Sequence, residues 1–419
     1  MLVLTVALIG DQAQAQLRVP NLNLPLPQRI GALDNDFIRT PQRLLDDTRI
    51  GELTGLRGKL VDNLLRRNKQ ALEADPRGAP AIRGEILAWS PSPAALQAAA
   101  AAGLRVLRER RVEGLDETIV VLGVPDGAGT AAMLERLRAL DPDGSYDFNH
   151  VYQGGGAAEA IPAAAAAAAR VGLIDSGVDA GHAVFAATRI TAWGCAGAAH
   201  PSAHGSAVAA LMVGRAPVFA GAAPGAALFA ADVYCGSPTG GAAEVIAAAL
   251  GWMAQQQVAV VNLSIVGPPN RTLERAVAAM VKRGHLLVAA VGNDGPAAPP
   301  LYPAGYPGVV GVSAVDRRGK VLPEAARGAQ VMFAAPGNDM VSAAPGAPPY
   351  RRVRGTSFAA PIVAAMLAGR LTRPDPEAAR AALADLARQA SGAVEGETGR
   401  GIVGMAFRVD PATLRRASD

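Results

Sequence analysis

Four polar residues of this sequence stand at the ends of apolar segments. Asp175 closes the run RVGLID and Asn293 follows the run HLLVAAVG, whereas His204 and Ser357 each begin an apolar, Ala-rich run. A serine hydroxyl is a poor nucleophile until an imidazole takes its proton, and a carboxylate fixes the tautomer of that imidazole. A side-chain amide can stabilise the oxyanion that develops during acyl transfer. The four residue types are therefore those that serine-based acyl transfer needs.

Each of these residues also has a purely structural explanation when it is taken alone. Asp and Asn are common in turns, and short polar side chains are common at the first positions of helices. In the stretch VRGTSFAAPIVA, residues 353–364, Thr356 could cap the helix and leave Ser357 in its first turn. The dipole of a helix stabilises negative charge at that position. Whether the four residues act together depends on the elements that carry them.

Short apolar runs with strand character alternate with helical runs from Arg170 onward. Continuous apolar strands separated by helices are typical of a parallel sheet covered on both faces. Binding sites in such sheets form beyond the carboxyl ends of the strands, where Asp175 and Asn293 stand. The sequence thus predicts an α/β domain with a doubly wound, mostly parallel sheet over residues 170–419. Its expected strands are residues 170–175, 226–234, 258–265, 285–293, 308–315 and 329–337, and its expected helices are residues 204–214, 240–256, 272–284 and the run after Ser357.

A smaller α+β unit is expected before this sheet. Strand, helix, strand, strand, helix and strand patterns follow one another within residues 82–153. That order is typical of a ferredoxin-like domain, a fold that does not by itself indicate a function. The sequence GGGAAEAIPAAAAAAA comes next and predicts a flexible linker. We therefore place the domain boundary within residues 154–169.

The N-terminal region has features of an exported protein. Residues 1–15 combine an apolar stretch with Ala13-Gln14-Ala15, which is similar to a signal-peptidase site, although the usual positive charges are missing. A buried apolar segment is the alternative. An extended arm and then an amphipathic helix or helical hairpin are expected within residues 16–81. We accordingly expect a periplasmic or extracellular protein with no stable membrane span.

The charge and the cysteines exclude several classes of site. The formal net charge is +4 and no long basic run occurs, so nucleic acid is not an expected partner. Cys195 and Cys235 form no C-x-x-C motif, which argues against zinc and thioredoxin-type sites. In an exported protein they could form a disulfide, and two unpaired core cysteines are the alternative. The sequence has no H-E-x-x-H motif, so we expect no catalytic metal.

Together, the motifs resemble those of the subtilisin-like serine proteases, the subtilases. The segments that carry the resemblance are, in chain order, VGLIDSGVD, AHGSAVAALMVG, VVNLSIVGP, VAAVGNDGP and RGTSFAAP. With its supporting segments the resemblance covers residues 170 to about 410. The chain order Asp, His, Ser is also that of this family.

The resemblance implies a role for each polar residue. Asp175 would orient the imidazole of His204, His204 would act as general base and acid, and Ser357 would be the nucleophile. Asn293 and the backbone N–H of Ser357 would bind the oxyanion. Val266 stands where the family usually has glycine and would narrow the cleft. The substrate-binding strand implied by the resemblance comprises Leu263, Ser264, Ile265, Val266 and Gly267.

The remaining histidines are not expected to take part in catalysis. His182 resembles a structural histidine in the turn after the family's acidic residue, and His200 belongs to a loop. His150 and His285 are expected at the surface or at the ends of strands.

The resemblance also implies how the protein is made. Residues 82–153 would be an inhibitory, chaperoning pro-domain whose tail occupies the cleft, and cleavage would fall within about residues 153–162. The expected partners are protein or peptide substrates and the chain's own pro-domain. No cofactor would be required for the chemistry; structural calcium is common in the family, but no Asp-rich loop identifies its ligands. A catalytically quiet scaffold with a plugged cleft and an acyl transferase are the alternatives to a serine endopeptidase.

Overall fold

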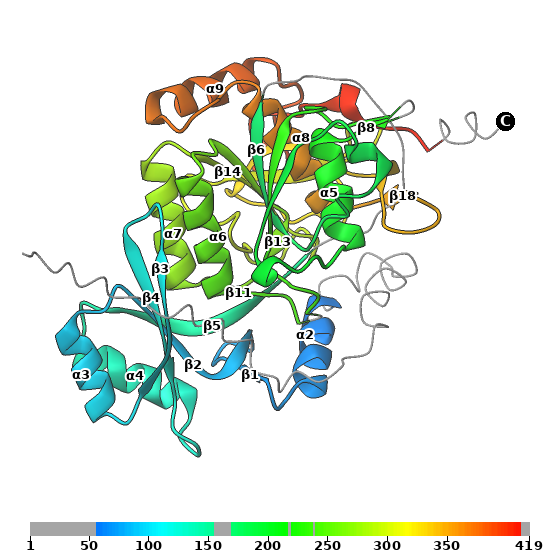
Figure 1. Cartoon of the computed structure of the whole chain (residues 1–419). Coiled ribbons are helices and arrows are strands. Elements are labelled where there is room, and N and C mark those ends of the chain that lie inside the picture. The colour runs from blue at the N-terminus through cyan, green and yellow to red at the C-terminus, as the bar shows by residue number, and fades with distance from the viewer. Residues whose placement is uncertain (1–55, 155–168, 217–218, 238, 412–419) are drawn as a thin grey trace, which may run out of the picture. The chain divides into compact units, whose positions relative to one another are not determined.

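A computed structural model describes residues 56–154, 169–216, 219–237 and 239–411 of the 419-residue chain (Figure 1). The predicted signal peptide and extended arm, and most of the predicted linker, lie outside these residues. The first described elements are the helix α2 (Leu56–Arg67) and the short strand β1 (Leu72–Ala74).

The larger sheet has seven strands, and every neighbouring pair in it is parallel. Helices cover both faces of such a sheet, so its strands are apolar at consecutive positions rather than at alternate ones. The predicted α/β fold with a parallel sheet is confirmed. In spatial order the strands are β16 (Val331–Pro336), β15 (Val310–Val315), β14 (Leu286–Ala290), β12 (Val260–Leu263), β6 (Arg170–Asp175), β10 (Ala227–Asp232) and β7 (Ile190–Trp193).

Two hydrophobic cores lie on the two faces of this sheet. Val288 and Ala290 of β14 belong to one core, and Leu287 and Ala289 belong to the other. Successive side chains of a strand point to opposite faces, which explains the division. Figure 1 shows the two helix layers on the two sides of the strands. The first core contains residues of α5 (Ala203–Val213), α8 (Thr356–Ala368) and α9 (Pro376–Arg388), and the second contains residues of α6 (Ala243–Gln255) and α7 (Arg271–Lys282).

Helices α5 and α8 are apolar on almost every side and almost completely buried. A helix of this kind occurs in the middle of a large core and not at the surface. Their many alanine side chains leave room for close packing, so these helices can bring His204 and Ser357 near the sheet.

A second, antiparallel sheet is formed by residues that precede the larger one. Its central strands lie in the spatial order β5-β2-β4-β3. Residues of two helices pack with one of its faces, and residues of its other face, such as Leu87 and Val121, join the core of α6 and α7. The elements are β2 (Pro80–Trp89), α3 (Pro93–Ala101), β3 (Arg105–Val112), β4 (Glu117–Gly123), α4 (Thr130–Leu140) and β5 (Ser145–Gly154).

Strand β5 connects the two parts of the structure. Its first half pairs with β2, and its last residues pair antiparallel with β11 (Gly241–Ala242) and β13 (Ile265–Val266). Both of these short strands come from the part of the chain that forms the larger sheet. The remaining elements are β8 (Arg215–Ala216), β9 (Phe219–Ala220), β17 (Met340–Ala343), β18 (Tyr350–Val353), and the 3₁₀ turns η3 (Ala183–Phe185), η4 (Cys195–Gly197) and η5 (Met405–Phe407).

Two of the histidines lie deeper than the sequence suggests. His285 lies at the start of a strand as expected, directly before β14, but it is only 3% exposed. His150 lies within β5 and is 2% exposed, so the expectation of a surface or strand-end position is wrong for it. His150 contacts Asp75 and Asn270, and His285 contacts the carbonyl of Val258. A single polar residue at the edge of an apolar run shows its burial only when its partners from other segments are known.

Candidate active site

Asp175 is the last residue of β6 and is fully buried. Its Oδ1 accepts hydrogen bonds from the backbone N–H and the hydroxyl of Ser176, at 2.7 and 2.9 Å. The same oxygen lies 2.8 Å from Nδ1 of His204. The turn that ends the strand therefore fixes the carboxylate and aims it at the imidazole.

His204 is in the first turn of α5, where the hydroxyl of Ser202 accepts its backbone N–H. Because Nδ1 faces the carboxylate of Asp175, Nδ1 carries the ring proton and Nε2 is the basic nitrogen. The ring lies 5.4 Å, between centroids, from that of Phe358, the neighbour of Ser357. The side chain of His204 keeps 15% of its surface exposed, against 1% for that of Asp175.

Ser357 lies in the first turn of α8 and is fully buried. Pro361 stands four residues later and has no N–H, so it cannot donate the usual helical hydrogen bond to the Ser357 carbonyl. The hydroxyl of Ser264 donates to that carbonyl instead, at 2.8 Å. The Ser357 hydroxyl in turn donates to the Ser264 carbonyl at 3.3 Å. The missing N–H of Pro361 thus leaves the Ser357 carbonyl available to Ser264, which lies between β12 and β13.

The side chain of Asn293 contacts the backbone that leads into α8. Its Oδ1 accepts the N–H of Thr356 at 3.0 Å, so its Nδ2 is the end that can donate to another group. Gly355 has a φ of 125°, and an added Cβ there would lie 3.1 Å from Nδ2 of Asn293. A side chain at position 355 would therefore be strained and would crowd the amide.

The cap of α8 differs from the expectation. The N-cap residue is Gly355, which has no side chain to accept a hydrogen bond. The hydroxyl of Thr356 accepts the N–H of Gly292 instead, at 3.2 Å. The possible capping role of Thr356 is therefore not realised, because its hydroxyl accepts the Gly292 N–H.

The five residues expected to bind substrate, residues 263–267, lie next to Ser357. Leu263 and Ile265 are fully buried in the core of α6 and α7, so their side chains serve packing. Opposite them runs the end of β5: Gly154 pairs with Ile265 and Gln153 pairs with Val266. This main-chain pairing holds the extended end of β5 next to His204. Ser264 also binds Ser357, as described above, and Gly267 borders the pocket described next.

A pocket for Tyr152 was not foreseen from the sequence. The side chain of Tyr152 is fully buried, and its hydroxyl donates to the Pro268 carbonyl at 2.6 Å. An added Cβ at Gly267 would lie 2.2 Å from the Tyr152 ring. The glycine is therefore needed for this ring to enter. The signal in the sequence was an aromatic residue two positions before the Gly-rich linker, but Gly267 and Pro268, which contact it, lie more than 100 positions later.

Gly154, the last residue of β5, lies against His204. An added Cβ at Gly154 would be 3.3 Å from Cε1 of the imidazole ring. The last three residues of β5 thus connect the buried ring of Tyr152 to the contact between Gly154 and the His204 imidazole.

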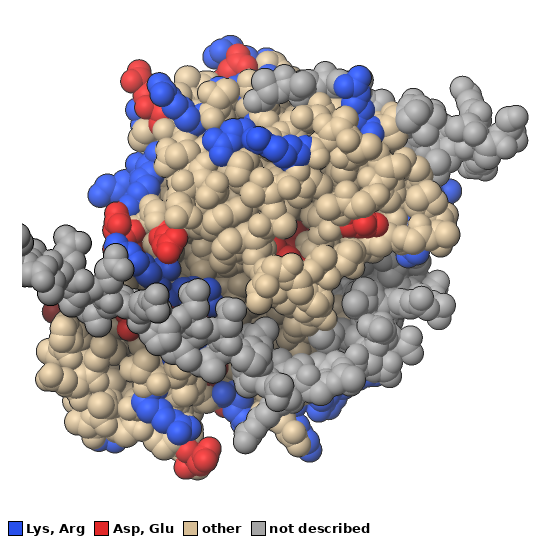
Figure 2. Space-filling view, in the orientation of Figure 1, with Lys and Arg blue, Asp and Glu red and all other residues tan. Residues whose placement is uncertain are grey.

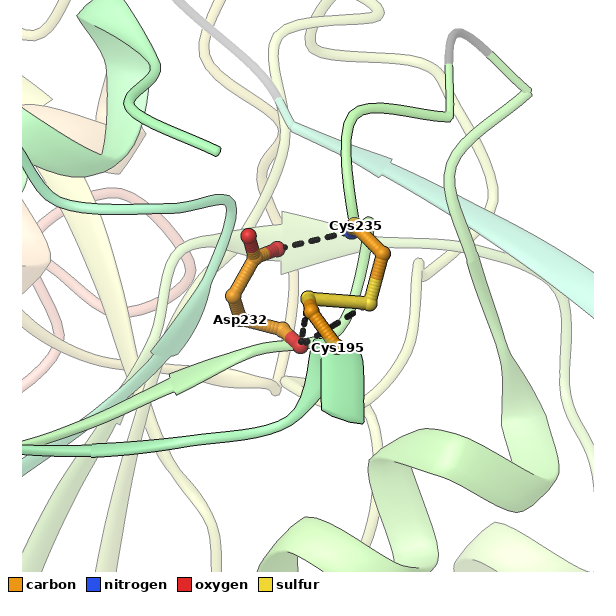
Figure 3. Close-up of side chains that lie close together, drawn as sticks. All are labelled: Cys195, Asp232 and Cys235. Atoms are coloured by element: carbon orange, nitrogen blue, oxygen red, sulfur yellow. Dashed lines mark hydrogen bonds between the residues drawn. A yellow bond between two sulfur atoms is a disulfide. The ribbon is translucent and has the colours of Figure 1, made fainter. Parts of the chain in front are cut away.

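The open question about the cysteines is settled in favour of a disulfide between Cys195 and Cys235 (Figure 3). It joins the turn after β7 to the turn after β10. Both sulfur atoms lie near the main-chain oxygen of Asp232, and Oδ1 of Asp232 accepts the N–H groups of Tyr234 and Cys235. Burial raises the pKa of Asp232, and these N–H groups oppose that effect.

Cys195, Asp232 and Cys235 form the single group of potential metal ligands found among the described residues. Zinc and similar metals are bound by thiolates, and the two sulfur atoms are bonded to each other. This group therefore does not fit a metal in its disulfide form.

On the face shown in Figure 2, basic side chains lie in separate groups with acidic side chains between some of them. Within the described ranges, each helix is too short or too polar to cross a membrane.

A sequence model of the subtilase family matches residues 166–401. Subtilisin BL from Lederbergia lenta is 40% identical over 145 residues, which are 34% of this chain and 53% of that protein. Thermitase from Thermoactinomyces vulgaris is 31% identical over 235 residues, which are 54% of this chain and 82% of thermitase. Fervidolysin from Fervidobacterium pennivorans, described as a keratinolytic enzyme related to subtilisin, matches with a TM-score of 0.63 at 19% sequence identity; the match covers 78% of this chain and 61% of that chain.

These likenesses differ in what they support. At 19% identity the fervidolysin match shows the fold alone. The chain spans 37% to 53% of the lengths of the curated subtilisins and alkaline proteases that it matches. The family model, however, covers more than half of the chain, and most of thermitase is matched at 31% identity. The chain therefore belongs to the subtilase family.

Proposed function

We propose that this protein is a serine endopeptidase that hydrolyses peptide bonds and is made as a self-inhibited precursor. The observation that carries the proposal is the hydrogen bond of 2.8 Å between Asp175 and His204, at the strand edge that also holds Ser357 and Asn293. Membership of the subtilase family supports the same reaction.

In the proposed mechanism, Nε2 of His204 takes the proton of the Ser357 hydroxyl as Oγ attacks the carbonyl carbon of the scissile bond. Asp175 keeps the proton on Nδ1 and stabilises the imidazolium that forms. His204 then gives its proton to the leaving amine, and the C–N bond breaks to leave an acyl-enzyme. A water molecule, deprotonated by the same imidazole, hydrolyses the ester and restores the Ser357 hydroxyl.

The negative charge of the tetrahedral intermediate would be held by two donors. One is Nδ2 of Asn293, whose direction follows from the bond between its Oδ1 and the Thr356 N–H. The other is the N–H of Ser357, in the first turn of α8, where the helix dipole also favours negative charge. Donors fixed in advance need no reorganisation during the reaction.

The proposed precursor is inhibited by its own β5 strand. Residues 151–154 pair with β11 and β13 in the way that an extended substrate would, and Gly154 reaches the imidazole of His204. We propose that residues 82–153 act as a pro-domain and that the chain cuts itself within residues 153–162. Export to the periplasm or the extracellular space, with protein or peptide substrates and no nucleic acid partner, belongs to the same proposal. No cofactor takes part in the proposed chemistry, and any structural calcium remains unassigned.

The test compares the full-length chain with its Ser357→Ala variant after identical purification. Intact mass and N-terminal sequencing should find the wild type split within residues 153–162 and the variant whole. A fluorophosphonate probe should label the wild type alone. If both chains are split alike, a host protease cut the linker and the self-processing proposal loses its support.

The alternative is a quiet scaffold whose cleft stays plugged, and the complete burial of Ser357 beside β5 favours it. An unsplit wild type that resists the fluorophosphonate probe would support the scaffold and overturn the endopeptidase. An acyl transferase would be labelled as well, and it would join an added amine to a peptide substrate in preference to water.

A further inference from the structure

Two buried carboxylates face each other where the smaller sheet meets α6. Glu85 on β2 and Glu244 in the first turn of α6 have side chains 8% and 2% exposed. Between them lies the guanidinium of Arg108, from β3. We call Glu85, Arg108 and Glu244 the Arg108 cluster.

The guanidinium binds both carboxylates with several hydrogen bonds. Its Nη1 and Nη2 donate to Glu85 at 2.8 and 2.6 Å, and its Nε lies 3.0 Å from each carboxylate oxygen of Glu244. Asn149 of β5 completes the arrangement by donating to Glu85 at 2.8 Å. The position of Glu244 in the first turn of α6 also suits its negative charge.

The cluster differs in kind from the other contacts at this interface. Strand β5 pairs with β11 and β13 through main-chain groups, which any extended segment can supply. Apolar contacts can also be made by many different side chains of similar volume. A buried carboxylate is more selective, because it has lost its hydration and needs a positively charged partner to compensate. Glu244 therefore accepts one kind of partner, a segment that brings a base to this position.

We propose that Arg108 determines how long the cleaved N-terminal segment stays bound to the rest of the protein. Glu244 is the residue of the larger domain that recognises this segment. This inference rests on the self-processing proposed above. When Arg108 is removed, Glu85 and Glu244 remain as two buried negative charges without their shared partner. A foreign segment without a base at this position would leave Glu244 in the same state. The cluster thus selects the chain's own segment.

The experiment uses three variants of the full chain: Arg108→Met, Glu244→Gln and the two combined. After self-cleavage, retention of the N-terminal fragment is followed by size-exclusion chromatography and by the rate at which peptidase activity appears on dilution. Each single variant should release the fragment about tenfold faster or more, and the double variant should resemble the single ones because both break one network. The matched control is Arg111→Met, on the same strand, whose ion pair with Asp116 is exposed at 70% and 83% and should matter little.

A second readout separates this proposal from the proposed function. In the Ser357→Ala background the chain stays whole, and hydrogen exchange of the α6 and β3 amides should rise in Arg108→Met and Glu244→Gln but not in Arg111→Met. If the wild type is never cleaved, the peptidase proposal fails while this exchange experiment still tests the cluster. Unchanged release and unchanged exchange in folded variants would overturn the inference, and so would fully additive effects of the two changes.

Discussion

The edge of the large sheet that carries Asp175 and the interface that carries the Arg108 cluster are both polar and both buried, but they are held together differently. Asp175 is fixed largely by Ser176, the next residue, and His204 by Ser202, two residues earlier. Arg108 binds residues 23 and 136 positions away. Asp175 and His204 thus each have a supporting residue within two positions in the sequence, whereas Ser357 and Asn293, like Arg108, depend on partners from distant segments.

Short segments of this kind can be recognised in a sequence, because the spacing itself carries the geometry. A pair of residues 136 positions apart leaves no such mark. Three experiments test how far the difference between the two regions extends, and a fourth tests a buried histidine outside both.

The largest effect is expected from Asp175→Asn. Loss of the carboxylate leaves His204 in the wrong tautomer, and kcat/KM on a peptide substrate should fall about 1,000- to 10,000-fold. The matched control is Asp232→Asn, whose residue pairs with Asp175 on the neighbouring strand. Its Oδ1 accepts two backbone N–H groups, which an amide oxygen can also accept, so less than about a tenfold loss is expected. Equal losses in both variants would contradict the assignment of Asp175.

Replacing both cysteines by serine should lower the free energy of unfolding by about 4 kcal/mol. The disulfide closes a loop with a sequence separation of 40, and closing it restricts the unfolded chain. Urea unfolding of the Ser357→Ala background, with and without the two substitutions, measures the loss. Adding a reducing agent should reproduce it in the parent and leave the double-serine chain unchanged. A parent as stable reduced as oxidised would show that local packing alone holds these turns.

A smaller effect is expected from Gly267→Ala, because the added methyl group would overlap the ring of Tyr152. In the uncleaved Ser357→Ala background it should cost about 1–3 kcal/mol of unfolding free energy. Combining it with Tyr152→Ala should cost less than the sum of the two changes. Gly181→Ala is the control, since its added Cβ would approach no atom closer than 3.5 Å. Strict additivity would mean that the ring does not occupy this pocket.

The smallest expected effect is on the pH dependence of stability, and it concerns His285, which belongs to neither region. Burial lowers the pKa of His285, which lies next to the Val258 carbonyl. The unfolded chain therefore takes up a proton at a higher pH than the folded chain does. Stability should be full above the ordinary histidine pKa of about 6.5 and should be lost as the pH falls through the lower, folded value. Unfolding curves between pH 8 and 5 should show a weaker pH dependence for His285→Gln than for the parent chain.

The sequence by itself determined six of the seven strands of the large sheet, most of its helices and the residues at its polar edge; strand β7 and helix α9 were not predicted. Strands buried on both faces must be apolar at consecutive positions, and a carboxylate, an imidazole or an amide at their ends then stands out. The β-α-β-β-α-β order within residues 82–153 could be read from the same periodicities, because each element is defined by residues close together in the chain.

Only the tertiary structure decided which distant residues share an environment. Residues of separate segments meet at His150, at the hydrogen bond from the Gly292 N–H to the Thr356 hydroxyl, around Tyr152 and in the Arg108 cluster. The free energy of a buried polar group depends on its partner, and a partner more than 100 residues away is fixed by topology and packing. Local sequence patterns therefore predicted most of the helices and strands and the candidate catalytic residues, whereas the contacts that would hold the N-terminal segment in place depend on the tertiary structure.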